Sequence, residues 1–159
     1  MDVFAALPGA GRILSLDIGA KRVGAAISDE LQISVRPLEL IRRTSWKKLL
    51  IRVQEIIQMF DAQAVVLGLP LSMDGTEGDA CSDIRRLYDN FRASLSVPVF
   101  LQDERLTSRS AEESLRAQGV AADEIPQKVD GVAAVIILED FLSMREERVR
   151  ALSNLDQTH

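Results

Sequence analysis

The first forty residues alternate between short apolar runs and turn-forming residues, a pattern typical of β-strands joined by tight connections. The run Ile13–Ile18 is almost wholly apolar and is followed by a glycine, so we expect a buried strand that ends there. A second β-rich run covers Arg22–Ser28, and a third covers Ile33–Ile41, where Pro37 favours an edge strand or a bulge. The short connections predict that these three strands form an antiparallel meander.

Apolar residues then recur with the helical period of 3.6 residues. An amphipathic helix is predicted from an N-cap at Thr44 or Ser45 to Phe60. Short apolar runs at Ala64–Gly68 and Val99–Gln102 indicate two more strands, and a second amphipathic helix lies between them. Strands that alternate with helices in this way favour parallel pairing through right-handed crossovers.

Two further helices are predicted in the last third of the chain. One follows an N-cap at Thr107, covers Ser110–Gln118 and stops at Gly119. The other runs from about Gln127 to Met144, and its centre is apolar on every side. The whole pattern predicts one α/β domain over residues 1–159, with 1–11 and 146–159 as tails. Its core is a five-stranded mixed sheet, antiparallel meander plus parallel strands, with helices on both faces.

Composition narrows the chemistry that such a domain could perform. The chain has 159 residues, of which 47% are hydrophobic and 27% charged, as in an ordinary globular protein. Cys81 is its only cysteine and His159 its only histidine, at the very end of the chain. These counts exclude an intrachain disulfide and disfavour histidine-based catalysis and zinc sites. Enzyme chemistry would have to rest on carboxylates, with Lys or Arg as helpers.

Charge and hydropathy give weaker indications. The net charge of −5 does not indicate nucleic-acid binding, and each local basic cluster taken alone is better explained as solvated surface. The clusters are Lys21-Arg22, Arg42-Arg43, Lys47-Lys48, Arg85-Arg86 and Arg105 with Arg109. No apolar run is long enough to cross a bilayer, and the start of the chain does not look like a signal peptide. We therefore expect a cytoplasmic protein without membrane contact.

Four acidic residues stand at places where chemistry could occur. Asp17 interrupts an apolar strand, which is costly unless the carboxylate is paired or binds a metal, although an Asx turn beside glycine is the alternative. Asp103 and Glu104 end the last predicted strand, where only one of them can face Asp17 and a surface ion pair with Arg105 is the alternative. Asp130 is equally well explained as a charge at a helix N-terminus and as a metal ligand.

Together these carboxylates suggest a site for hard divalent ions. Mg²⁺ and Mn²⁺ accept the same oxygen ligands, and two such ions about 4 Å apart can drive phosphodiester cleavage without histidine or cysteine. The loop Leu69–Gly78 could hold a phosphate through backbone amides, although a plain surface connection explains it equally well. No P-loop pattern is present.

Four blocks of the sequence resemble the YqgF (RuvX) family, and they occur in the order found in that family. The blocks are Leu16–Asp29 (LDIGAKRVGAAISD), Gly68–Gly78 (GLPLSMDGTEG), Asp103–Ser108 (DERLTS) and Val129–Ala134 (VDGVAA). They extend over nearly the whole chain. The resemblance implies a ribonuclease-H-like fold and a relationship to Holliday junction resolvases. It also implies a nuclease that matures the 5′ end of the pre-16S ribosomal RNA in ribosome biogenesis.

The resemblance also assigns roles to individual residues. It implies that Asp17, Glu104 and Asp130 form a catalytic acidic triad that binds Mg²⁺ or Mn²⁺, with Asp103 as the alternative to Glu104. Substrate-binding residues follow on the same basis, with Arg105 added as a neighbouring cation. They are Lys21, Arg22, Asp74, Gly75, Thr76 and Arg105.

Other functions stay open at this point. The same chemistry could resolve branched DNA, where two matched cuts favour a homodimer over a monomer. A non-catalytic module that binds nucleic acid or pre-ribosomal particles is a hypothesis from another class, and the acidic net charge leaves room for it. A phosphotransferase of the actin-like type is less favoured, because such proteins generally need two domains and this chain has length for one.

Overall fold

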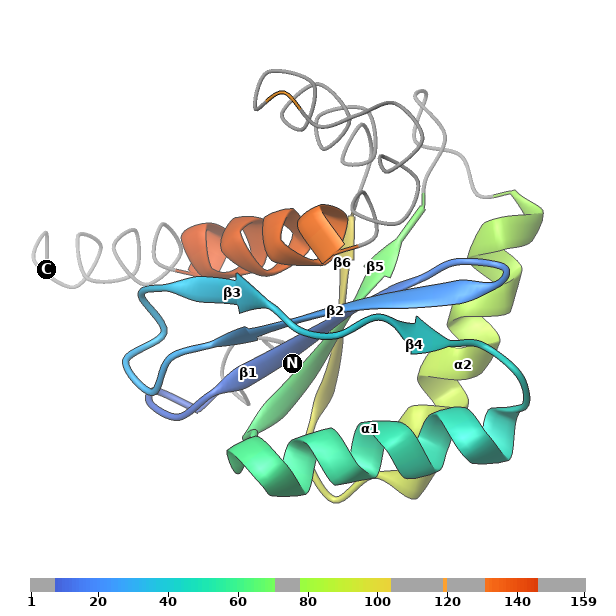
Figure 1. Cartoon of the computed structure of the whole chain (residues 1–159), viewed down its shortest axis with the longest axis horizontal. Helices are drawn as coiled ribbons and strands as arrows, with labels where there is room; N and C mark the ends of the chain where they lie inside the picture. The colour runs from blue at the N-terminus through green and yellow to red at the C-terminus, as the bar shows by residue number, and fades with distance from the viewer. Residues whose placement is uncertain (1–7, 71–77, 104–118, 120–130, 146–159) are drawn as a thin grey trace, which may run out of the picture.

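The computed structural model describes residues 8–70, 78–103, 119 and 131–145, and Figure 1 shows how their elements are arranged. Six strands form one sheet in the order β3-β2-β1-β5-β6, and β4 also pairs with β2. The strands are β1 (Ile13–Ile18), β2 (Arg22–Ser28), β3 (Val35–Pro37), β4 (Ile41–Arg42), β5 (Ala64–Leu69) and β6 (Val99–Asp103). The helices are α1 (Trp46–Phe60), α2 (Asp79–Ser94) and a helix described over residues 131–145, called helix 131–145 below.

The predicted mixed sheet is confirmed, but it has six strands and not five. The predicted third strand is divided into β3 and β4, which both pair antiparallel with β2. Pro37 pairs with Ala26 and Ile41 with Val23, so this side has one residue more than β2 between the two pairs. That extra residue is a β-bulge, as the proline indicated.

The two amphipathic helices between strands are where the periodicity predicts them. Ser45 is the N-cap of α1, and its side chain accepts a hydrogen bond from the Lys48 backbone N–H at 3.3 Å. Asp61 ends α1 in the left-handed conformation, with φ of 52°. The predicted helix Ser110–Gln118 lies outside the described residues, as does the start of the helix predicted from Gln127.

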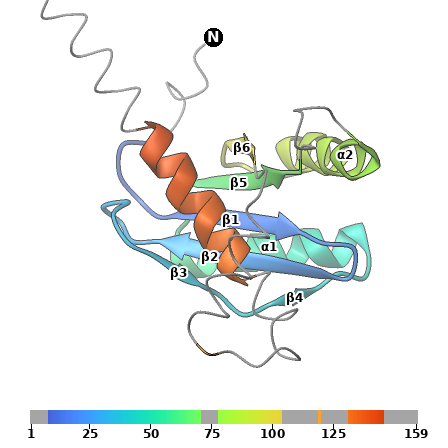
Figure 2. The same cartoon turned by 90° about the horizontal axis from the view of Figure 1, so that it is seen from above.

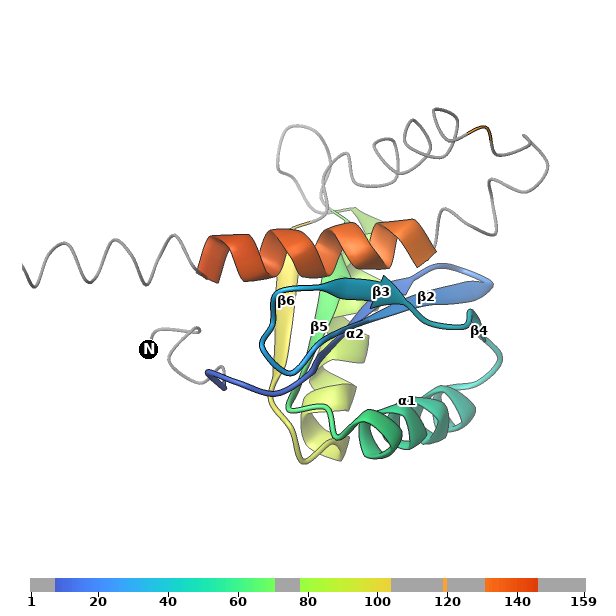
Figure 3. The same ribbon diagram turned by 60° about the vertical axis from the view of Figure 1, so that its left-hand side comes forward.

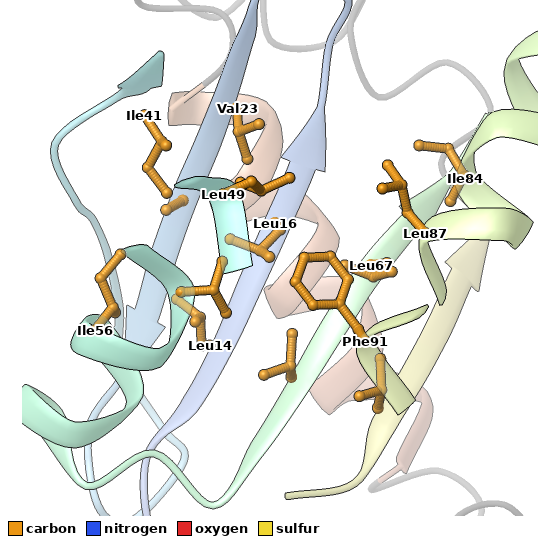
Figure 4. Close-up of a cluster of buried hydrophobic side chains, with 14 of the residues drawn as sticks. Leu14, Leu16, Val23, Ile41, Leu49, Ile56, Leu67, Ile84, Leu87 and Phe91 are labelled. Carbon is orange, nitrogen blue, oxygen red and sulfur yellow. The ribbon is translucent and has the colours of Figure 1, made fainter. Parts of the chain in front are cut away.

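Helices cover both faces of the sheet, so the domain has three layers (Figures 2 and 3). Leu14 and Leu16 of β1 belong to the core cluster formed with α1 and α2, which Figure 4 shows in close-up. Ile13 belongs to the second cluster, in which Ile137 and Phe141 of helix 131–145 take part. Because successive strand residues point to opposite faces, the odd-numbered residues of β1 face helix 131–145.

The strands β1, β5 and β6 run parallel, so their carboxyl ends lie along one edge of the sheet. Asp17, Leu69 and Asp103 all stand at that edge, as predicted. Open α/β sheets bind their ligands outside this edge.

Only residues 8–11 of the two predicted tails are described, and there the Gly11 N–H donates to the Glu30 carbonyl at 2.7 Å. Among the described helices, none is both long and apolar enough to cross a membrane.

Candidate active site

Asp17 occupies a buried position beneath helix 131–145. Only 9% of its surface is exposed, and its side chain is on the same face of β1 as those of Ser15 and Ile13, because alternate strand residues share a face. The fully buried Ser15 hydroxyl donates to the Ala134 carbonyl of that helix at 2.7 Å, which fixes the face on which the odd-numbered residues lie. A carboxylate so placed is costly unless polar groups or a cation compensate it. Asp17 is therefore a buried strand residue and not part of an exposed turn.

The strands beside β1 place one more polar side chain on this face. Val66 and Phe100, which align with Ser15 across β5 and β6, belong to the cluster under helix 131–145. Two residues further along β6, Gln102 is therefore on the same face. It is buried, and its amide donates to the Met144 sulfur at 3.2 Å. The end of β6 thus places Gln102 on the same face of the sheet as Asp17.

Asp103 projects from the opposite face of the sheet. It pairs with Leu69 on β5, which belongs to the core cluster under α1 and α2. Leu101, two residues earlier, packs against that same cluster. Asp103 is therefore separated from Asp17 by the sheet itself. Glu104 lies outside the described residues.

The third predicted acid, Asp130, also lies outside the described residues and directly precedes helix 131–145. At the start of that helix, an added Cβ on Gly131 would lie 3.7 Å from the Pro37 Cβ, which places the helix start beside β3. Because two of the three predicted ligands are outside it, the described part of the chain contains no group of three acidic, histidine or cysteine side chains able to hold a metal.

The turn between β1 and β2 is held by the backbone and by one arginine. The Gly19 N–H donates to the Arg22 carbonyl at 2.9 Å. The Arg43 guanidinium donates to the Gly19 carbonyl at 3.0 Å and to both Asp83 oxygens of α2, at 3.0 and 3.3 Å. The Arg43 N–H also donates to the Lys21 carbonyl at 2.9 Å. Arg43 therefore ties the turn next to Asp17 to α2.

Sequence reasoning missed this role of Arg43. The Arg42-Arg43 pair stood out as a basic cluster, but no local pattern connects Arg43 to Asp83, which lies forty residues away. Of the predicted substrate-binding residues, Lys21 is exposed and Arg22 is half-buried at the start of β2. The others, Asp74, Gly75, Thr76 and Arg105, lie outside the described residues.

The mixed sheet with helices on both faces is a ribonuclease-H-like fold. The structure of Thermus thermophilus RuvC in complex with a Holliday junction superposes with a TM-score of 0.54 at 15% identity, over 86% of this chain and 96% of that one. A second Thermus thermophilus RuvC structure gives a TM-score of 0.50 at 16% identity, over 86% and 96% of the two chains. At such identity the likeness concerns the fold alone.

The chain belongs to the RuvX family, described as Holliday junction resolvase, whose model matches residues 11–144. A relative from Syntrophus aciditrophicus (strain SB) is 37% identical over 139 residues, covering 87% of this chain and 93% of its own. A relative from Anaeromyxobacter dehalogenans (strain 2CP-1) is 39% identical over 134 residues, covering 84% and 98%. Both carry the name "Putative pre-16S rRNA nuclease". The predicted family is thereby confirmed.

Proposed function

We propose that this member of the RuvX family is a nuclease that hydrolyses phosphodiester bonds in precursor 16S ribosomal RNA at its 5′ end. The observation that carries the proposal is the buried carboxylate of Asp17 at the carboxyl edge of a ribonuclease-H-like sheet. The name shared by relatives that match most of the chain supports the choice of substrate. The proposal includes that the protein acts in the cytoplasm, on pre-ribosomal particles.

Asp17, Glu104 and Asp130 are the proposed catalytic residues and metal ligands. Strand alternation supports Glu104 over Asp103, because Asp103 is on the face opposite Asp17. The bond between Ser15 and Ala134 supports Asp130. From that bond, Asp17 is two residues along the strand, about 7 Å. Asp130 is four positions before Ala134 in the sequence.

The helix crosses the strands on the face of the sheet that carries Asp17. Its start, Gly131, lies beside Pro37 of β3, and Phe141 packs on Phe100 of β6. Because Asp130 immediately precedes this helix in the sequence, a position on the same face as Asp17 is part of the proposal.

The donor set fits Mg²⁺ or Mn²⁺, because hard divalent ions prefer carboxylate oxygens and a buried carboxylate gains most from a bound cation. When bound, such ions activate a water and stabilise negative charge on the leaving oxygen. The chain's own residues position the substrate. Lys21 and Arg22 belong to the turn after β1 that backbone hydrogen bonds hold. They are proposed to contact the nucleic-acid backbone together with Asp74, Gly75, Thr76 and Arg105.

Cleavage of labelled precursor 16S RNA tests the proposal. Wild-type protein should cut with Mg²⁺ or Mn²⁺ and stop in EDTA. Asp17→Asn should cut at least about 100-fold more slowly, because several kcal/mol of charge stabilisation depend on the metal. Asp103→Asn is the matched control, since it removes an acid from the opposite face and should cut at nearly the wild-type rate. Equal cutting by wild type and Asp17→Asn would remove the proposal.

A second candidate function is the resolution of Holliday junctions, favoured by the description of the family. Two matched cuts require a symmetric dimer. A four-way DNA junction should therefore be assayed beside the RNA, and the mass of the protein in solution should be measured. Cutting of the junction by a dimer would favour this candidate, and a monomer that ignores junctions would exclude it. Binding of RNA without cutting of either substrate would indicate a non-catalytic module.

A further inference from the structure

Two neighbouring arginines at the end of β4, Arg42 and Arg43, differ in the face of the sheet on which they lie. Arg43 is occupied by the Gly19 carbonyl and by Asp83 of α2. Arg42 belongs to the other face, because its strand neighbour Ile41 is in the core cluster under α1 and α2. Arg42 is exposed. Its backbone is nonetheless fixed by pairing with β2 and by the adjacent Arg43.

Arg42 pairs directly with Arg22 across β2 and β4. Side chains that face each other in an antiparallel pair have Cβ atoms about 4.5–5.5 Å apart, and like charges there are destabilising. The next pair along, Val23 with Ile41, is apolar and packs into the core. The pairing thus places two arginines next to each other on one face of the sheet.

That face is the one on which Asp17 lies. Asp17 pairs with Gly24 of β2, and Arg22 is two residues from Gly24 on the same face. Gly24 has no side chain, so no β2 side chain stands directly opposite the carboxylate. Diagonal neighbours on a sheet face are about 7–8 Å apart, within reach of an arginine. Arg22 is therefore a diagonal neighbour of Asp17, and Arg42 lies on the far side of Arg22, on β4.

We propose that Arg22 and Arg42 together form a binding site for a backbone phosphate of the nucleic-acid strand that passes Asp17. Guanidinium groups bind phosphate with two parallel hydrogen bonds, and one phosphate between them offsets the repulsion of the pair. Arg42 is the new residue here, since Arg22 was expected to face substrate. The inference rests on the proposed function, because it takes the strand at Asp17 to be the substrate.

The number of phosphate contacts can be counted from the salt dependence of binding, without any cleavage. Binding of a labelled single-stranded RNA and of a four-way DNA junction would be measured in EDTA over a range of salt concentrations. The slope of log K against log salt is negative, and each lost phosphate contact reduces its magnitude by about 0.7 for a single strand and about 0.9 for duplex DNA. Arg42→Gln should reduce the magnitude of the slope by about that amount with at least one probe, and that probe identifies the nucleic acid bound there.

Two further variants keep the test sharp. Arg36→Gln is the matched control, because Arg36 is an exposed arginine of β3 on the opposite face, 5.3 Å from the centre of the Phe60 ring, and should leave the slope unchanged. Arg42→Lys keeps the charge and should keep the slope. A wild-type slope for Arg42→Gln with both probes, or an equal fall for Arg36→Gln, would overturn the phosphate site.

The outcomes separate this inference from the proposed function. Protein that binds with an Arg42-dependent slope but cuts neither substrate would keep the phosphate site and refute the nuclease. Protein that cuts RNA with a slope independent of Arg42 would do the reverse. The thermal midpoint of Arg42→Gln should equal or slightly exceed that of wild type at low salt, since the substitution removes a like-charge pair.

Discussion

Gly19 is the residue at which the turn beside Asp17 is most sensitive to one added atom. Its N–H donates to the Arg22 carbonyl at 2.9 Å, and a Cβ on residue 19 would meet that same oxygen at 2.7 Å. The obstacle is backbone, so no flexible side chain can move away. Gly19→Ala must therefore open the turn that holds Asp17 and Arg22 in place.

The cost follows from these two contacts. Overpacking of this kind costs about 1–3 kcal/mol, and weakening the hydrogen bond adds about 0.5–1.5 kcal/mol. Alanine also lowers the conformational entropy of the unfolded chain, which offsets about 0.4–1 kcal/mol of this cost. The free energy of unfolding should therefore fall by about 0.5–4 kcal/mol, which lowers the thermal midpoint by about 1–16 °C for a domain of this size.

Thermal unfolding and metal-dependent cleavage, measured on the same preparation, test this expectation. Gly9→Ala is the matched control, because an added Cβ at Gly9 meets only the end of the Arg145 side chain, at 3.8 Å. At a temperature where both variants are folded, Gly19→Ala should cleave about tenfold or more slowly than Gly9→Ala, since small misplacements at a reacting centre are costly. Equal midpoints and equal rates for the two variants would refute the reasoning.

Two other predictions concern hydrogen bonds made by the side chains of two buried serines and of Asp29. Ser15→Ala and Ser28→Ala each remove a buried hydrogen bond, and each should lower the free energy of unfolding by about 1–2 kcal/mol. Only Ser15→Ala, which removes the hydrogen bond to the Ala134 carbonyl, should also slow cleavage by the folded protein. An equal loss of rate in both would contradict this. The backbone N–H of Ile33 holds the pKa of Asp29 below its ordinary value. Stabilisation by Asp29 is therefore present above about pH 4 and lost as pH falls through the lowered pKa, so the midpoints of wild type and Asp29→Ala should converge in acid and differ at pH 7.

Much of the fold could be predicted from local pattern because each signal is carried by neighbouring residues. The apolar runs of β1 and β5 and the Ser45 cap of α1 are of this kind. The division of the third strand could not be read in the same way. It depends on which β2 residues the segment meets, and the Leu38 N–H donates to the Ala25 carbonyl between the two short strands.

The same difference between local pattern and strand pairing applies to the candidate site. Asp17 could be found from sequence because an acid in an apolar strand is conspicuous. The choice between Asp103 and Glu104 could not be made, since it depends on the phase of β6 relative to β5, which the pairing of Leu69 with Asp103 fixes. The faces of Arg42 and Arg43 likewise follow from pairing with β2 and not from composition.

The central claim is that Asp17, Glu104 and Asp130 make one metal site, and calorimetric titration with Mn²⁺ tests it without any substrate. Wild type and Asp103→Asn should bind the ion alike, whereas Asp17→Asn, Glu104→Gln and Asp130→Asn should each lose most of the binding heat. Loss of binding in Asp103→Asn with full binding in Glu104→Gln would contradict the alternation of β6. Undiminished binding in Asp17→Asn would contradict the account as a whole.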